Sequence, residues 1–75
     1  MKYLTKETYA SGHSTQHIRP NKEDVIHYLR LLLDINQTEY HPLIEEFDNT
    51  GKLDFHLIKR NRSIYHVQIV PLWEV

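Results

Sequence analysis

The stretch from Leu53 to Val70 constrains the fold most, because apolar residues alternate with polar ones on both sides of Asn61. Such alternation is typical of two strands that share one buried face, so the stretch predicts a β-hairpin. All the apolar positions are odd-numbered, which requires a loop with an odd number of residues. A three-residue loop from Arg60 to Arg62 satisfies this, with Asn61 suited to positive φ. The apolar positions are Leu53, Phe55, Leu57, Tyr65, Val67 and Ile69.

The tip of this hairpin is the most basic short segment of the chain. It carries Lys59, Arg60 and Arg62 around Asn61. We predict that Lys59, Arg60 and Arg62 bind a partner. If that partner is a nucleic acid, Asn61 joins them and the basic side chains contact phosphates.

A second pattern predicts an amphipathic helix from about Lys22 to Asn36. Asn21 can cap its first turn, with Asp24 in the third position after the cap. Leu31 and Ile35 widen the apolar band, so this helix can contact both its own sheet and another subunit. The other apolar positions, at helical spacing, are Val25, Ile26, Leu29, Leu32 and Leu33.

The remaining segments give weaker signals. Pro42 suits the first turn of a short helix over Leu43–Asp48, which Asn49 and Gly51 end. Weak alternation over Met1–Tyr9 predicts an edge strand. The segment His13–Ile18 either returns as a second strand or stays irregular.

Together these elements predict a single small α+β domain over residues 1–75. A three- or four-stranded, mostly antiparallel sheet packs against one main helix, with a short second helix and a C-terminal β-hairpin. A chain of 75 residues gains only about 3 to 5 kcal/mol from its core. The sequence contains no cysteine for a disulfide, so we expect a homodimer that uses the apolar C-terminal tail from Val70 to Val75 or the wide helix band.

Charge is distributed unevenly although the net charge is only −1. Segment 1–22 has four basic residues against one acid, segment 23–54 has eight acids against two basic residues, and segment 55–75 has three basic residues against one acid. The chain therefore has an acidic middle between basic ends, which favours self-pairing or an oppositely charged partner.

Six histidines raise the question of a metal site. His56 and His66 face each other if the loop is three residues long, and Asp54 lies nearby, so a zinc site is one interpretation. Since no third ligand has a diagnostic spacing, we predict instead a solvated strand face, with no metal and no other cofactor. A calcium loop starting at Glu46 is excluded because its twelfth position is Leu57.

Catalysis is also not expected. His56 or His66 beside basic residues provides ingredients of a metal-independent ribonuclease, but no nucleophile–base spacing or phosphate loop accompanies them. We therefore predict no catalytic residues, no small-molecule substrate and no enzyme activity. Nor does any segment have the length and apolarity of a membrane helix, so we expect a cytoplasmic protein.

Aromatic content points to protein binding. Aromatic residues make up 11% of the chain, more than a small core can bury fully, and such residues dominate interfaces. Trp73 beside Leu72 is the best candidate contact with another protein or a second copy. We predict an adaptor, inhibitor or accessory protein, in size and composition similar to compact proteins of phages and mobile elements.

The alternative function is nucleic-acid binding in the manner of a winged helix, for example by a small transcriptional regulator. A helix, a short helix and a hairpin with a basic tip occur in that order at the end of such domains. Against it, Glu45, Glu46 and Asp48 lie on the short helix that would have to enter the major groove, where they would repel phosphates.

Overall fold

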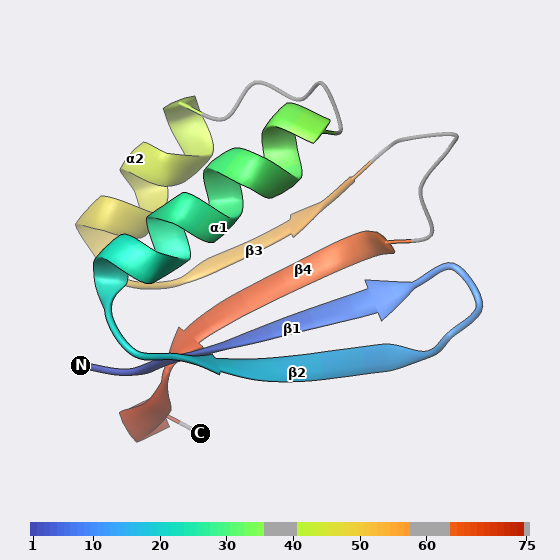
Figure 1. Cartoon of the computed structure of the whole chain (residues 1–75), viewed down its shortest axis with the longest axis horizontal. Helices are drawn as coiled ribbons and strands as arrows, with labels where there is room; N and C mark the ends of the chain where they lie inside the picture. Colours follow the sequence, from blue (N-terminus) through green and yellow to red (C-terminus); the bar gives the residue numbers. More distant parts are fainter. Residues whose placement is uncertain (36–40, 58–63, 75) are drawn as a thin grey trace.

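The computed structural model describes residues 1–35, 41–57 and 64–74. The four strands form one sheet in the order β2-β1-β4-β3, and every neighbouring pair is antiparallel (Figure 1). This confirms the predicted α+β fold with a C-terminal hairpin. In chain order the elements are β1 (Tyr3–Tyr9), β2 (Ser14–Arg19), α1 (Lys22–Ile35), α2 (His41–Thr50), β3 (Leu53–His56), β4 (Ile64–Pro71) and the 3-10 helix η1 (Leu72–Glu74).

The prediction that residues 1–9 form an edge strand is wrong. β1 lies inside the sheet and pairs with β2 on one side and β4 on the other. Tyr3 and Thr5 are buried on one face, whereas Leu4 and Lys6 are only half-buried on the other. The weak alternation reflects the fact that only one face of β1 is covered, and it carries no information about neighbouring strands. The pairing with β4 links residues far apart in the sequence, so the local pattern could not reveal it.

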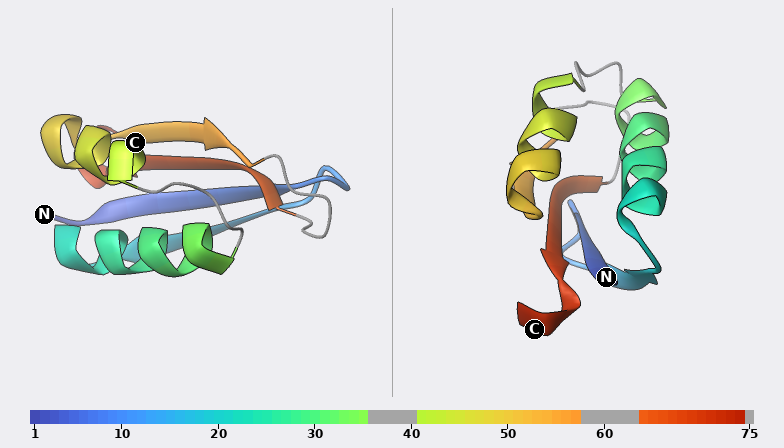
Figure 2. Two further views of the ribbon diagram at one scale, coloured as in Figure 1. Left: turned by 90° about the horizontal axis from the view of Figure 1, so that it is seen from above. Right: turned by 90° about the vertical axis from the view of Figure 1, so that its left-hand side faces the viewer.

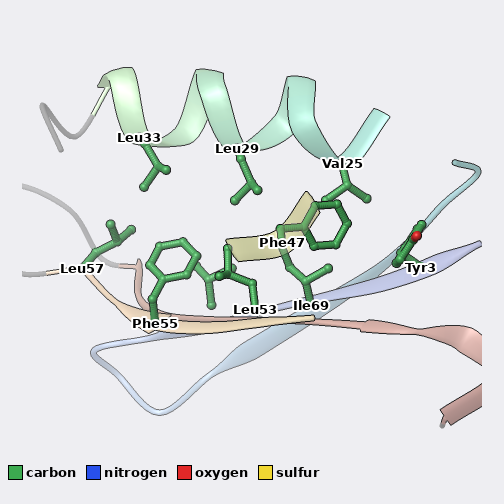
Figure 3. Packing of buried hydrophobic residues seen from close by; sticks show 10 residues of the cluster. Tyr3, Val25, Leu29, Leu33, Phe47, Leu53, Phe55, Leu57 and Ile69 are labelled. Atoms are coloured by element: carbon green, nitrogen blue, oxygen red, sulfur yellow. The ribbon is translucent and has the colours of Figure 1, made fainter. Parts of the chain in front are cut away.

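Both helices cover the same face of the sheet and leave the opposite face open (Figure 2). Val25, Leu29 and Leu33 on α1 are fully buried, and Figure 3 shows them pointing at the sheet. Phe47 from α2 is also fully buried, with its ring edge-on to Tyr3 at 5.2 Å between centroids. The sheet contributes Tyr3, Leu53, Phe55, Val67 and Ile69 to this core, and Leu57, directly after β3, adds to it.

The ends of the helices follow the chemistry predicted for them. The backbone N–H of Asp24 donates to Asn21 Oδ1 at 2.8 Å, so Asn21 is the cap of α1. Helix α2 is longer than the predicted Leu43–Asp48 at both ends. It stops at Gly51, whose φ of 76° is accessible to glycine at little cost.

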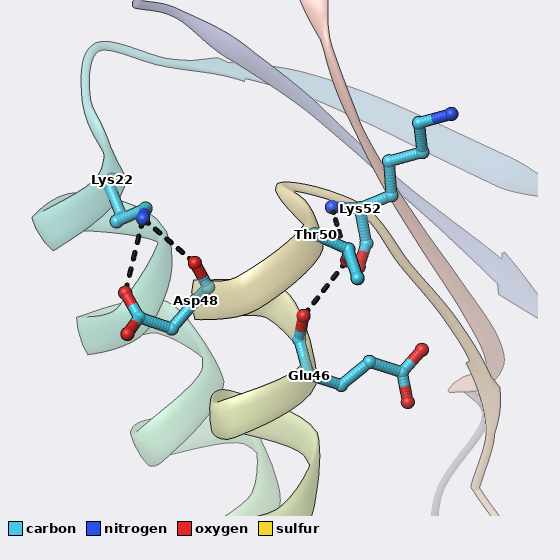
Figure 4. A network of polar contacts seen from close by, with 5 residues as sticks. All are labelled: Lys22, Glu46, Asp48, Thr50 and Lys52. Carbon is cyan, nitrogen blue, oxygen red and sulfur yellow. Dashed lines mark hydrogen bonds and ion pairs between the residues drawn. The ribbon is translucent and has the colours of Figure 1, made fainter.

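A polar network ties the two helices together (Figure 4). Lys22 Nζ donates to Asp48 Oδ1 and to the Asp48 carbonyl, both at 3.1 Å. The Thr50 hydroxyl lies 2.9 Å from the Glu46 carbonyl and accepts a hydrogen bond from the Lys52 N–H at 3.2 Å. These contacts join the start of α1 to the end of α2 and set the exit of the chain into β3.

The hairpin register is the one predicted from the odd-numbered apolar residues. Leu53 pairs with Ile69, Phe55 with Val67, and His56 with His66. The proposed loop, Arg60–Arg62, lies outside the described residues.

Candidate functional site

The open face of the sheet presents three rows of side chains that cross several strands. Because side chains alternate along a strand, the even-numbered residues of β1, β2 and β3, and those of β4 from His66 onward, lie on the face that the helices leave uncovered. The apolar row holds Ile18, Leu4 and Val70; the middle row holds Gln16, Lys6, Gln68 and Asp54; the imidazole row holds Ser14, Thr8, His66 and His56.

The apolar row continues into the C-terminal turn. Ile18 is 62% exposed, and Leu4 and Val70 beside it are half-buried. Helix η1 leaves the sheet on the side opposite α1 and α2 (Figures 1 and 2). It carries Trp73, which is 68% exposed and whose indole N–H donates to the sulfur of Met1 at 3.0 Å.

This end of the open face is defined here as the apolar end and consists of Met1, Leu4, Ile18, Val70 and Trp73. Among the residues with described side chains, four large hydrophobic ones are exposed, and three of them (Met1, Ile18 and Trp73) belong to the apolar end. An exposed aromatic residue beside aliphatic side chains is the composition of an interface core.

Polar side chains adjoin the apolar end. Lys6 lies in the middle row, and Lys2 and Lys52 are exposed just outside β1 and β3. The one acidic side chain in the three rows, Asp54, accepts hydrogen bonds from Gln68 Nε2 at 3.1 Å and from His66 Nε2 at 2.6 Å. The bond from His66 is the main cause that holds the pKa of Asp54 below its usual range. The lysines beside the apolar end therefore favour a partner surface that carries carboxylates.

The histidines of the imidazole row stack on each other instead of converging. The rings of His56 and His66 are 4.3 Å apart between centroids and only 10° from parallel. Parallel stacked rings direct their nitrogens side by side, whereas metal ligands must point at one centre. Within residues 1–35, 41–57 and 64–74, no group of three or more His, Cys, Asp or Glu side chains could hold a metal ion.

The helix-covered face contains a second polar cluster, at the edge next to β2. Glu7 accepts hydrogen bonds from the hydroxyls of Tyr28 at 2.5 Å and Tyr9 at 3.1 Å. Burial, followed by the bond to Glu7, raises the pKa of Tyr28 well above that of free tyrosine. The guanidinium of Arg19 lies 4.3 Å from the centroid of the Tyr28 ring, and its Nε donates to the buried Thr5 hydroxyl at 3.3 Å. This cluster fixes α1 on β1 and β2.

The structure places only some of the predicted site residues. Trp73 is exposed and Leu72 is half-buried in η1. The basic tip of Lys59, Arg60, Asn61 and Arg62 lies outside the described residues. Sequence reasoning named Val70 as the start of the apolar tail but missed Leu4 and Ile18; the three meet only because β2, β1 and β4 are neighbours. Their even spacing within strands was the available signal, but strand order was needed to assemble them.

The fold and its surface define a class: a small α+β protein with two helices on one face of an antiparallel sheet and an apolar end on the other. No protein-family model matches the sequence, and neither curated proteins nor solved structures yield a match. In the described part of the chain, neither helix is long and apolar enough to cross a membrane.

Proposed function

We propose that this chain is a small non-catalytic binding protein, an adaptor, inhibitor or accessory factor, that captures another protein with the apolar end of its open face. The observation that supports this most is the exposure of Trp73 and Ile18 next to the half-buried Leu4 and Val70. A tryptophan with aliphatic neighbours gives a large contact area and few rotamers to order on binding.

The flanking charges indicate the chemistry of that partner. Lys2, Lys6 and Lys52 lie around or beside the rows of the open face. Glu45 is exposed on α2, which covers the opposite face, whereas Glu46 of the same helix borders a pocket that it shares with Lys52 and Val70. A partner with an apolar pocket bordered by carboxylates would match both the rings and the lysines. Together with the absence of cysteine, a reducing, cytoplasmic location is part of this proposal.

The test compares wild-type protein with the double variant Ile18→Ser/Trp73→Ala in affinity capture followed by mass spectrometry. Asn49→Ala is the control, because Asn49 is exposed on α2, outside the apolar end and outside α1 and β2. Partners lost by the double variant and kept by the control support the proposal. The proposal fails if the double variant captures the same proteins in the same amounts as the wild type.

Trp73 also provides a direct readout, since it is the single tryptophan of the chain. With a purified partner, its fluorescence emission should move to shorter wavelength as the indole leaves water. Emission that does not change at saturating partner would place the contact elsewhere and contradict a role for the apolar end.

Nucleic-acid binding is the second candidate, and the observation that favours it is the same set of lysines beside an exposed aromatic ring. Proteins that bind single-stranded nucleic acids use basic side chains to contact the backbone and aromatic rings to stack on the bases. The basic residues 59–62 would add to this charge. Titration with a duplex and with a single-stranded oligonucleotide at several salt concentrations separates the two functions. Affinity that falls steeply with salt, about one log unit per log of salt for each phosphate contacted, supports this candidate.

A further inference from the structure

The two edges of the sheet differ in how they are protected against pairing. β3, at one edge, has four residues, includes Asp54 and directly follows Lys52. β2, at the other edge, has six residues and pairs with β1 over its whole length without a register shift. Natural edge strands are usually blunted by shortness, charge, proline or a bulge. From Ser14 to Ile18, β2 has none of these features.

The hydrogen-bond pattern shows which backbone groups β2 offers at its outer side. The N–H of Tyr9 donates to the carbonyl of His13 at 2.7 Å, and this pair continues the β1–β2 register. Hydrogen-bonded pairs alternate along an antiparallel ladder, so the odd-numbered residues of β2 bond to β1. The N–H and C=O groups of Ser14, Gln16 and Ile18 therefore face outward.

We propose that this outer edge pairs with the same edge of a second copy, so that two sheets join into one of eight strands. Antiparallel pairing about a two-fold axis at Gln16 sets Gln16 opposite itself and Ser14 opposite Ile18 of the second copy. This register keeps the open faces of both copies on one side. It also opposes no two like charges, because Thr15 lies opposite His17 and Arg19 lies beyond the paired segment.

Helix α1 adds a second contact layer along the same edge. A pocket of about 260 Å³ lies beside α1 at the end of β2, and among the described residues it is lined by Arg19 of β2 and by Asp24, His27, Tyr28, Leu31 and Leu32 of α1. Leu31 at its border is 54% exposed. Across the two-fold axis, Leu31 of each copy is positioned to cover the pocket of the other.

Charge along α1 favours an antiparallel arrangement of the two helices. Helix α1 runs antiparallel to β2 above it. Near its start, Asp24 lies 3.9 Å from Arg19 at the end of β2. Further along, Tyr28 bonds to Glu7, whose partner in β2 is Thr15. A two-fold axis through Gln16 then brings the acidic first turn of one α1, Glu23 and Asp24, toward the half of the other that carries Arg30. Opposite charges meet at symmetric positions, which selects a second copy as the occupant.

The experiment is light scattering coupled to size exclusion, across a wide range of protein concentration, on the full chain. Gln16→Pro removes an outward N–H and leaves the bonds to β1 in place. Gln16→Thr is its matched control, because it changes the side chain and keeps the N–H. Leu31→Ser tests the helix contact, and Trp73→Ser, an exposed position at the apolar end, is the corresponding control.

We expect a wild-type dimer, a dimer dissociation constant at least about tenfold higher in Gln16→Pro and Leu31→Ser, and no change in the two controls. A wild type that stays monomeric at every concentration overturns the proposal, as does a dimer lost in Trp73→Ser and kept in Gln16→Pro. If Gln16→Pro does not fold, hydrogen exchange of the wild type decides. The outward amides of Gln16 and Ile18 must exchange more slowly as concentration rises, and concentration-independent exchange refutes edge pairing.

Edge pairing uses only the backbone of Ile18, whereas the apolar end uses its side chain together with Trp73, so the failure of the edge interface and the failure of the proposed function are distinguishable. A monomer can still capture a partner through Trp73, and a dimer can form without doing so. An extended segment of another protein would use the same outward groups, but it would leave the wild type alone monomeric and so count against the proposal.

Discussion

Replacing Phe47 by alanine is the most severe single test of the packing described here. Phe47 is fully buried, its ring meets Tyr3 edge-on at 5.2 Å between centroids, and it belongs to the same core cluster as Val25 and Leu29 of α1. Truncation of a buried phenylalanine costs about 3 to 5 kcal/mol, because the transfer free energy is lost and a cavity remains. A chain of this length has a free energy of unfolding of about 4 to 11 kcal/mol.

The loss is therefore comparable with the whole stability of the fold. We expect the melting temperature to fall by at least about 12 °C, since 1 kcal/mol shifts it by about 4 to 8 °C in domains of this size. Far-UV circular dichroism in heat and urea is the suitable assay, because the exposed Trp73 reports poorly on the core. Leu43→Ala, at a partly buried position on the same helix, is the control and should cost less. A loss below about 1 kcal/mol for Phe47→Ala would refute the proposed position of α2.

Three further predictions concern polar contacts. Asn21→Ala removes the cap of α1 and should lower the free energy of unfolding by about 1 kcal/mol in urea melts, with Asn49→Ala, an exposed position near the end of α2, as the control. Tyr28→Phe removes a hydrogen bond to the Glu7 carboxylate and should lower the free energy of unfolding by about 1.5 kcal/mol at neutral pH. Because folding raises the pKa of Tyr28, this stabilisation is complete below the pKa of tyrosine in the unfolded chain, about 10, and is lost as the pH rises above it. The difference between wild type and variant should therefore shrink in alkaline melts. Asp54→Asn acts in the opposite pH range. Folding lowers the pKa of Asp54, so the carboxylate stabilises the fold above about pH 4, and this stabilisation is lost as the pH falls through the folded pKa. Since the side chain is largely exposed, the free energy of unfolding of the variant should fall by no more than about 1 kcal/mol near pH 6 and should equal that of the wild type in strong acid.

Elements with local signals could be predicted from the sequence. The bounds of α1 and its cap follow from Asn21 and the apolar spacing after it, both of which act within a few residues. The hairpin register follows from parity, because a one-residue slip would move Phe55 and Val67 to the open face. Parity also predicted the cross-strand pair His56 and His66, although not that the rings stack.

The candidate site could be predicted only in part. Trp73 stands out in the sequence through its type and its apolar neighbours, and it is exposed in the structure; its role as a contact stays a prediction. The apolar row does not stand out, because Leu4, Ile18 and Val70 belong to three strands and become neighbours only through the pairing of β1 with both β2 and β4. The pairing of β1 with β4 joins strands from the two ends of the chain, so no local pattern in the sequence signals it.

The two proposed surfaces have a joint consequence. In edge pairing about Gln16, Ile18 of one copy lies opposite Ser14 of the second copy, which is four residues before the second copy's own Ile18. The two apolar ends therefore lie on one continuous face, on opposite sides of the two-fold axis, and the two Ile18 residues are roughly 13 Å apart along the strand direction. A partner molecule with one pocket would occupy each end independently, whereas a densely immobilised or two-fold symmetric partner would engage both at once and gain from the effective concentration of the second contact.

Gln16→Pro should therefore weaken binding to a densely immobilised partner while leaving the affinity for the same partner free in solution unchanged. Trp73→Ala should weaken both, because it removes the contact itself. Surface plasmon resonance at two partner densities, beside a solution titration, measures these quantities. Equal losses for Gln16→Pro in both formats would mean that the β2 edge itself contacts the partner, and the two surfaces could then no longer be regarded as separate.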